Sequence, residues 1–145
     1  MQTSKNLTKE PPRSPRQRIG GYVILGRTID KCRALLWGNF GDYHFDCPLD
    51  NIMFGFKGVT GDDFKKEVES GAGDEALAHW LDTHGTLKSP DEIKAWGDQV
   101  EQFSMVNSDD PEKVEYFITE TTKLGLDPYK TSVFTWLETD DKASF

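Results

Sequence analysis

The stretch that decides the fold is "SPRQRIGGYVILGRTIDKCRALL", Ser14–Leu36. It opens with the signals of a helix start, because Ser14 can cap the first turn, Pro15 suits the first helical position, and Gln17 follows three residues after the cap. At 100° per residue its apolar side chains share one face, which predicts an amphipathic helix from Pro15 to about Leu36. These side chains are Ile19, Tyr22, Leu25, Ile29, Cys32 and Leu36.

The same stretch contains "GYVILGRT", Gly21–Thr28, which follows the phosphate-loop pattern G-x-x-x-x-G-K-[ST] with Arg27 in place of the lysine. A phosphate loop needs an apolar strand before its first glycine and a helix beginning at its end. Here a helix start precedes it, so we predict helix and no nucleotide site. Gly20, Gly21 and Gly26 are then expected where another element approaches closely.

Beyond this stretch the sequence predicts a mainly α fold of about six or seven short helices. Thr60, Ser89 with Glu92, and Asp110 mark three helix starts by their capping side chains. A short extended or hairpin segment is expected near residues 37–48, where polar and apolar residues alternate. Residues 128–138 fit a helix or a strand, because they are rich in Thr, Val and aromatic residues.

The length of 145 residues is that of one ordinary domain. We expect a single compact domain over residues 13–145, preceded by a mobile tail at residues 1–12. No apolar run approaches the roughly 20 residues of a membrane span, and residues 1–12 lack the apolar core of a secretory signal. A cytoplasmic location with both cysteines reduced is therefore expected.

Charge is distributed unevenly along the chain, whose net charge is −8. Residues 1–36 hold eight Lys or Arg and two acids, whereas residues 37–145 hold nine Lys and twenty-three acids. Every arginine lies within residues 13–33. The arginines either bind a carboxylate or phosphate, or dock the basic segment on the acidic body. We expect no nucleic-acid partner, since the acidic remainder repels phosphates.

Candidate binding residues lie on the first predicted helix. Arg16, Arg27 and Lys31 fall on one side of the helical wheel, with Gly20 leaving open floor between the arginines for an anion. Asp30 and Arg33, three residues apart, are expected to pair with each other, with Arg27 also within reach of Asp30. That pair has a purely structural interpretation as well, in which it fixes helix packing.

The segment "DYHFDC" supplies a second group of candidates. In an extended strand Asp42, His44 and Asp46 would face one side, where two carboxylates can bind a metal or orient His44 as a base. The spacing matches no zinc signature, so we expect no metal, and no cofactor motif is present.

The runs "PPRSPRQRIGGYVILGRTIDKCRA", "GDYHFDCPLD" and "FGFKGVTGDDF" resemble the bacterial domain-of-unknown-function family 5069. The resemblance implies a complete small protein and no particular activity. It also implies that the arginine segment and "DYHFDCPLD" belong to one family pattern, which favours their meeting in space.

The expected function is a cytosolic domain that binds a small anionic ligand between the first helix and the following loop. The alternative is an interaction module or homo-oligomer without ligand, its basic helix docked on an acidic protein partner. A third hypothesis is an acid/base enzyme using His44 with Asp46 or Asp30, although no nucleophile motif accompanies it. The ligand-binding candidates are Arg16, Arg27, Asp30, Arg33, Tyr43 and His44.

Overall fold

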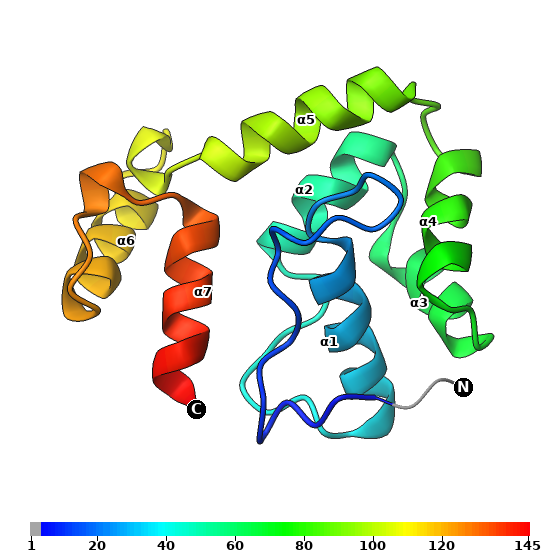
Figure 1. The fold of residues 1–145 in the computed structure, drawn as a ribbon, viewed down its shortest axis with the longest axis horizontal. Helices are drawn as coiled ribbons and strands as arrows, with labels where there is room; N and C mark the ends of the chain where they lie inside the picture. The colour runs from blue at the N-terminus through cyan, green and yellow to red at the C-terminus, as the bar shows by residue number, and fades with distance from the viewer. Residues whose placement is uncertain (1–3) are drawn as a thin grey trace.

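The computed structural model describes residues 4–145, which form a single compact fold of seven α-helices and two short 3-10 helices (Figure 1). This confirms the predicted mainly α fold class, and residues 133–144 are helical. No strand occurs within residues 4–145. The elements are α1 Leu25–Trp37, α2 Pro48–Lys57, α3 Gly61–Glu69, α4 Asp74–Thr83, α5 Pro90–Gln102, η1 Met105–Asn107, α6 Pro111–Lys123, η2 Pro128–Lys130 and α7 Val133–Ser144.

The helix starts predicted from capping residues are confirmed. The Thr60 hydroxyl accepts the Asp63 N–H at 3.2 Å and begins α3. Ser89 and Glu92 form a reciprocal capping box at the start of α5, with both hydrogen bonds at 3.1 Å. In each case a polar side chain satisfies a backbone donor that the first helical turn leaves open.

The predicted helix from Pro15 is wrong over its first ten residues, because α1 begins only at Leu25. The chain instead turns at Gly20 and Gly21, whose φ angles of 58° and 90° favour glycine, and Ile19 and Tyr22 form an isolated antiparallel bridge. The Ile24 N–H donates to the Pro15 carbonyl at 2.7 Å. Two adjacent glycines allow a tight turn that the periodicity of the apolar residues conceals.

Gly20 marks a close approach, as predicted, but not between two arginines. A Cβ added there would lie 2.6 Å from the Ala78 Cβ of α4. The open space that we expected at Gly20, between two arginines on one face of a helix, therefore does not exist.

The extended or hairpin segment predicted near residues 37–48 is an irregular loop between α1 and α2. Asp46 has a φ of 63°, which ends any strand-like alternation. Asp42, His44 and Asp46 consequently do not face one side of a strand.

Residues 4–8, which we expected to be part of a mobile tail, lie against this loop. The Leu7 side chain is buried, and its backbone N–H donates to the Asn39 carbonyl at 2.9 Å. Residues 1–3 of the predicted tail lie outside the described part of the chain.

Figure 1 shows α1 to α4 grouped together, α5 crossing the top of the view, and α6 and α7 on the other side. The buried core centres on α1 to α4, with Ile29, Phe54 and Phe64 among its members, and Phe134 of α7 joins it. The C-terminal half of α7 contacts α1 through the ion pair of Asp141 with Arg27, and the two helices border the pocket described next.

Candidate functional site

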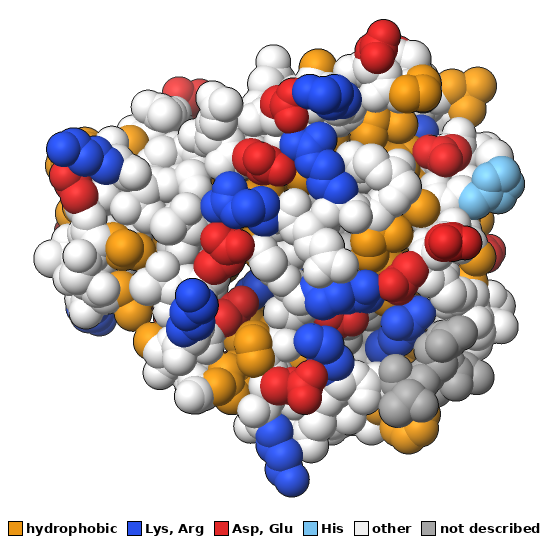
Figure 2. Space-filling model, in the orientation of Figure 1, with side chains coloured by type: hydrophobic (Ala, Val, Ile, Leu, Met, Phe, Trp, Pro, Cys, Tyr) orange, Lys and Arg blue, Asp and Glu red, His pale blue; other side chains and the backbone are white. Residues whose placement is uncertain are grey.

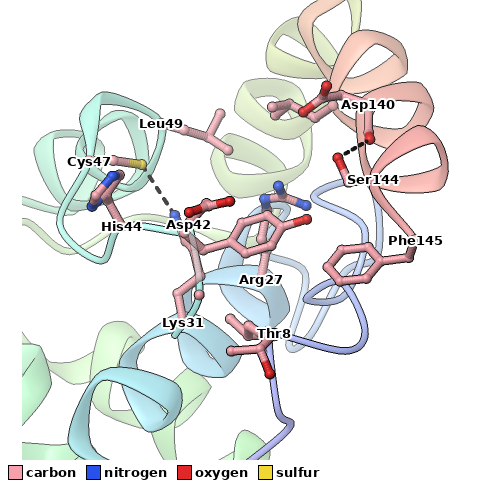
Figure 3. Close-up of a pocket in the computed structure, with 14 residues that line it drawn as sticks. Thr8, Arg27, Lys31, Asp42, His44, Cys47, Leu49, Asp140, Ser144 and Phe145 are labelled. Carbon is pink, nitrogen blue, oxygen red and sulfur yellow. Dashed lines mark hydrogen bonds between the residues drawn. The ribbon is translucent and has the colours of Figure 1, made fainter. Parts of the chain in front are cut away.

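A pocket of about 580 Å³ lies between α1, the loop of residues 38–47 and the end of α7 (Figure 3). Leu7, Leu49 and Leu137 give its lining an apolar part. The polar part of the lining consists of Arg27, Lys31, Asp42, Tyr43, His44, Cys47 and Asp140. The pocket therefore suits a small molecule with both apolar and charged groups.

Helix α1 supplies two cations to this pocket, Arg27 and Lys31, each only 3% exposed. They lie four residues apart and so project from the same face of the helix. Arg27 forks onto Asp141 of α7 at 2.7 and 3.3 Å, and Lys31 lies 3.0 Å from Asp50. Because burial of an unpaired charge is costly, these carboxylates permit both cations to sit at the pocket wall.

Tyr43 joins the loop to the Arg27–Asp141 pair. Its hydroxyl donates to Asp141 at 2.8 Å, and the Arg27 guanidinium lies 5.5 Å from the centre of its ring. The ring of Phe145 stacks nearly parallel to it, at 6.5 Å between centroids. Burial, and then the hydrogen bond to Asp141, raise the pKa of Tyr43 above its ordinary value, so the phenol stays a donor.

His44 and Cys47 line the pocket from the loop side. The Lys31 ammonium lies 3.2 Å from the Cys47 Sγ, as Figure 3 shows. Asp50 accepts the backbone N–H groups of Asp46 and Cys47 at 2.9 and 3.3 Å, so the carboxylate that pairs with Lys31 also fixes this end of the loop. The sulfur is thereby held beside a buried positive charge.

Asp140, on α7, adds a carboxyl group to the lining. Burial raises its pKa, and the negative charges of Asp141 and Glu120 raise it further. The Asp140 carboxyl therefore retains its proton to a higher pH than an ordinary aspartate.

Of the six residues predicted to bind a ligand, the structure brings Arg27, Tyr43 and His44 to this one pocket. Arg16 instead lies along α7, where it pairs with Glu138 at 3.2 Å and contacts Thr135 at 3.1 Å. Arg16 does not line the pocket because residues 15–24 leave the helical path on which its predicted position depended.

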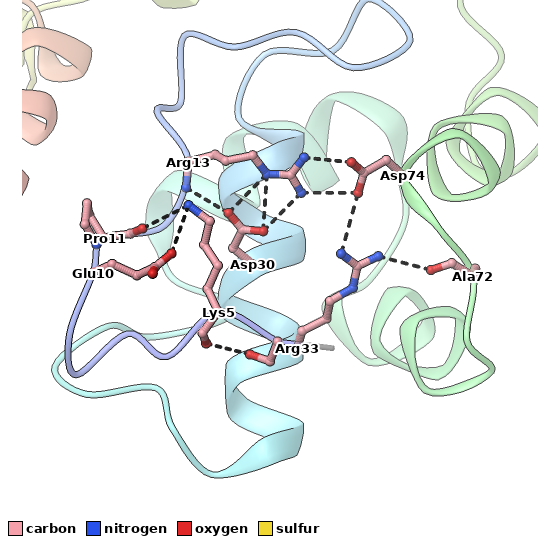
Figure 4. A network of polar contacts seen from close by, with 9 residues as sticks. Lys5, Glu10, Pro11, Arg13, Asp30, Arg33, Ala72 and Asp74 are labelled. Carbon is pink, nitrogen blue, oxygen red and sulfur yellow. Dashed lines mark hydrogen bonds and ion pairs between the residues drawn. The ribbon is translucent and has the colours of Figure 1, made fainter. Parts of the chain in front are cut away.

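Asp30 and Arg33 lie in a separate network (Figure 4), and their predicted mutual pair is wrong. Asp30 is bound by Arg13, whose guanidinium also bonds Asp74 at 2.7 Å. Arg33 lies 3.7 Å from Asp74 and donates to the Ala72 carbonyl at 3.4 Å. The two side chains diverge toward different partners, so neither serves the pocket.

Four residues at the site were not predicted as binding residues from the sequence: Cys47, Asp50, Asp141 and Phe145. Asp141 and Phe145 come from the end of the chain, more than a hundred residues after Arg27, and no motif links them. For the two cations, the usable signal in the sequence was the four-residue spacing of Arg27 and Lys31.

The remaining arginines of the basic segment bind carboxylates of the acidic body. Arg18, for example, reaches Asp98 at 2.8 Å and Glu101 at 3.0 Å on α5. On the face drawn in Figure 2, Lys and Arg side chains accordingly lie beside Asp and Glu side chains. The structural interpretation of the basic segment thus accounts for Arg13, Arg16 and Arg18.

Within residues 4–145 no three His, Cys, Asp or Glu side chains cluster as metal ligands would. Over the same range no helix combines the length and apolar character needed to cross a bilayer.

The fold and pocket define a small all-helical domain with a polar and apolar cavity built on its first helix. The chain belongs to the family described as Domain of unknown function (DUF5069), whose profile matches residues 9–143. No curated protein matches the chain.

Proposed function

We propose that this protein binds a small anionic ligand, a carboxylate or a phosphate, in the pocket between α1 and α7. The observation that carries the proposal is the placement of Arg27 and Lys31, two buried cations that line one cavity from successive turns of α1. An arginine fork and a lysine ammonium are the side chains that most often bind such anions.

The lining narrows the class of ligand. Tyr43 and His44 add polar groups beside the cations, while Leu49 and Leu137 offer apolar contacts. A compact organic acid or phosphate ester satisfies both parts of the lining better than a bare inorganic ion. Binding is expected to be weak, because Asp141 and Asp50 already neutralise the two cations.

NMR of the histidine rings tests this proposal, with acetate, benzoate and inorganic phosphate as probes. We expect the ring signals of His44, assigned with a His44→Gln variant, to move and saturate at millimolar probe concentrations. Lys31→Gln should abolish the shift. Arg18→Gln, which removes a cation outside the pocket, should leave it unchanged and serves as the matched control.

No saturable His44 shift with any probe would overturn the proposal, as would an equal shift in folded Lys31→Gln protein. Thermal melting of each variant separates loss of binding from loss of the fold.

The interaction-module alternative rests on exposed apolar side chains, including Leu35, Phe40 and Ile52, each 37–39% exposed. If the probes fail and sedimentation gives a dimer at micromolar concentration, that alternative takes first place. An enzyme using His44 with Asp30 is disfavoured, because Arg13 occupies the Asp30 carboxylate.

We also propose that the protein acts in a bacterial cytoplasm. Cys32 and Cys47 are free thiols, which suits a reducing compartment. The bacterial source follows only from the resemblance of the sequence runs to the family.

A further inference from the structure

The two cysteines occupy opposite environments. Cys32 is fully buried in the core, and burial raises its pKa to about 12, so it stays a protonated, inaccessible thiol at neutral pH. Cys47 is half-buried and lines the pocket, where a small molecule can reach its sulfur.

Lys31 gives the Cys47 sulfur a specific charged partner. Its ammonium carries three N–H donors, and the described residues offer it two acceptors, Asp50 Oδ2 at 3.0 Å and Cys47 Sγ at 3.2 Å. Asp50 is itself held by the Thr28 hydroxyl at 2.6 Å, so the lysine is anchored in the core and not free to swing away. Reactive cysteines lie in electropositive, partly exposed surroundings, and the fixed ammonium gives the Cys47 sulfur such surroundings.

The backbone before Cys47 is also fixed. Asp46 holds its left-handed conformation while its side chain and carbonyl accept the Asn51 amide at 2.9 and 3.1 Å. A Cβ added at Gly61 would lie 2.5 Å from the Asp46 carboxyl carbon, so α3 packs tightly behind this turn. The sulfur is therefore presented to the cavity from a rigid support.

We propose that Cys47 is a nucleophile that reacts covalently with small electrophiles entering the pocket, with Lys31 holding a positive charge beside the sulfur. The electrophiles it favours are those that carry a carboxylate or phosphate, because Arg27 lines the same cavity. The reaction is a displacement at carbon. The thiol proton passes to solvent, the sulfur electron pair forms the S–C bond, and the leaving group departs with the electrons of the broken bond.

This inference goes beyond reversible anion binding, which needs no sulfur. The two are tested separately by a neutral and an anionic alkylating agent of the same size, iodoacetamide and iodoacetate. Iodide is the leaving group in both.

The experiment measures alkylation rates of Cys47 and Cys32 at neutral pH by peptide mass mapping, in the folded wild-type protein and in the guanidinium-unfolded chain. Because folding places the Cys47 sulfur beside the Lys31 ammonium, we expect iodoacetamide to react with folded Cys47 about threefold or more faster than with the same unfolded thiol. Cys32 should react more slowly when folded than when unfolded. Lys31→Gln should remove the gain at Cys47, and Lys31→Arg, which retains the positive charge, should restore part of it.

Slower reaction of Cys47 in the folded than in the unfolded chain would overturn the inference, whether or not the Lys31 variants fold. So would an undiminished rate in folded Lys31→Gln protein. The ratio of the iodoacetate rate to the iodoacetamide rate should rise on folding, and millimolar phosphate should lower it. A different result is that folding raises the iodoacetamide rate of Cys47 without raising the ratio of the iodoacetate rate to the iodoacetamide rate. That result would support Cys47 as a nucleophile and contradict the anion site of the proposed function.

Discussion

The Asp30 carboxylate is bound by Arg13 through both main chain and side chain. The Arg13 backbone N–H donates to it at 2.8 Å, and the guanidinium at 3.0 to 3.2 Å. Since Asp30 lies on α1 and Arg13 also reaches Asp74 at the start of α4, this contact joins the N-terminal segment to two helices (Figure 4).

Replacing Asp30 with alanine should therefore destabilise the fold. Removing one partner of a largely buried pair leaves the other charge uncompensated, and Arg13 keeps only Asp74, so we expect a loss of about 2 to 3 kcal/mol. Chemical denaturation measures it. Asp98→Ala, which removes an exposed partner of Arg18, is the control and should have a much smaller effect. Equal midpoints for the wild type and Asp30→Ala would contradict this account of the network.

Asp74 should make stability depend on acid pH. The hydrogen bond from Arg13 lowers the pKa of Asp74 below its ordinary value, against the opposing effect of burial. A carboxyl group with a lowered folded-state pKa stabilises the protein fully above its unfolded pKa of about 3.9, and this is lost as pH falls through the folded value. Asp74→Asn should flatten the stability curve below pH 5, measured by urea unfolding at stepped pH. If the slope of stability against pH is unchanged in Asp74→Asn, the Arg13–Asp74 ion pair does not make stability depend on pH.

Local signals in the sequence predicted most of the helices. A cap such as Ser89 with Glu92 acts within one helical turn, so it can be predicted from neighbouring residues in the sequence. The start of α1 was mispredicted because apolar periodicity continues through residues 19–24, whereas Gly20 and Gly21 turn the chain there. A residue pattern does not encode which of two compatible backbones the tertiary packing selects.

The pocket was only partly predictable for a related reason. Arg27 and Lys31 share a helix face, which spacing reveals. Their counter-ions Asp141 and Asp50 come from other elements and are two among twenty-five acids. Only the folded structure shows which two of these acids pair with Arg27 and Lys31.

Tyr43→Phe should test the hydrogen bond that joins the loop to α7. The substitution keeps the ring stacked on Phe145 and beside Arg27 but removes the donor to Asp141, so we expect a loss of about 1 to 2 kcal/mol. Tyr22→Phe removes a similar bond, at 2.7 Å to Asp82, outside the pocket. Both variants should lose stability in denaturant unfolding, but only Tyr43→Phe should alter the His44 NMR signals. Altered His44 signals in both would point to a global change.

ATP and GTP with magnesium should leave the melting temperature unchanged. The phosphate-loop-like residues 22–25 are fully buried, so their backbone is closed to phosphate. A micromolar nucleotide site would add about 4 kcal/mol at a thousandfold excess of ligand, which a thermal shift assay resolves readily. A clear upward shift would mean that this segment opens to bind phosphate.

Asp141→Asn gives the sharpest test of the anion site, because it should move stability and binding in opposite directions. Arg27 is buried and Asp141 is the carboxylate on which it forks, so the variant should lose about 3 kcal/mol of stability. Removing the Asp141 charge also leaves the Arg27 guanidinium available to a ligand. Phosphate should then bind more tightly than to the wild type and restore part of the lost stability. Glu138→Gln releases Arg16 outside the pocket and should show no such gain. Denaturant unfolding with and without phosphate, at constant ionic strength, measures both effects. If phosphate stabilises Asp141→Asn no more than the wild type, then Arg27 serves only to hold α7 against α1, and the pocket does not select anions.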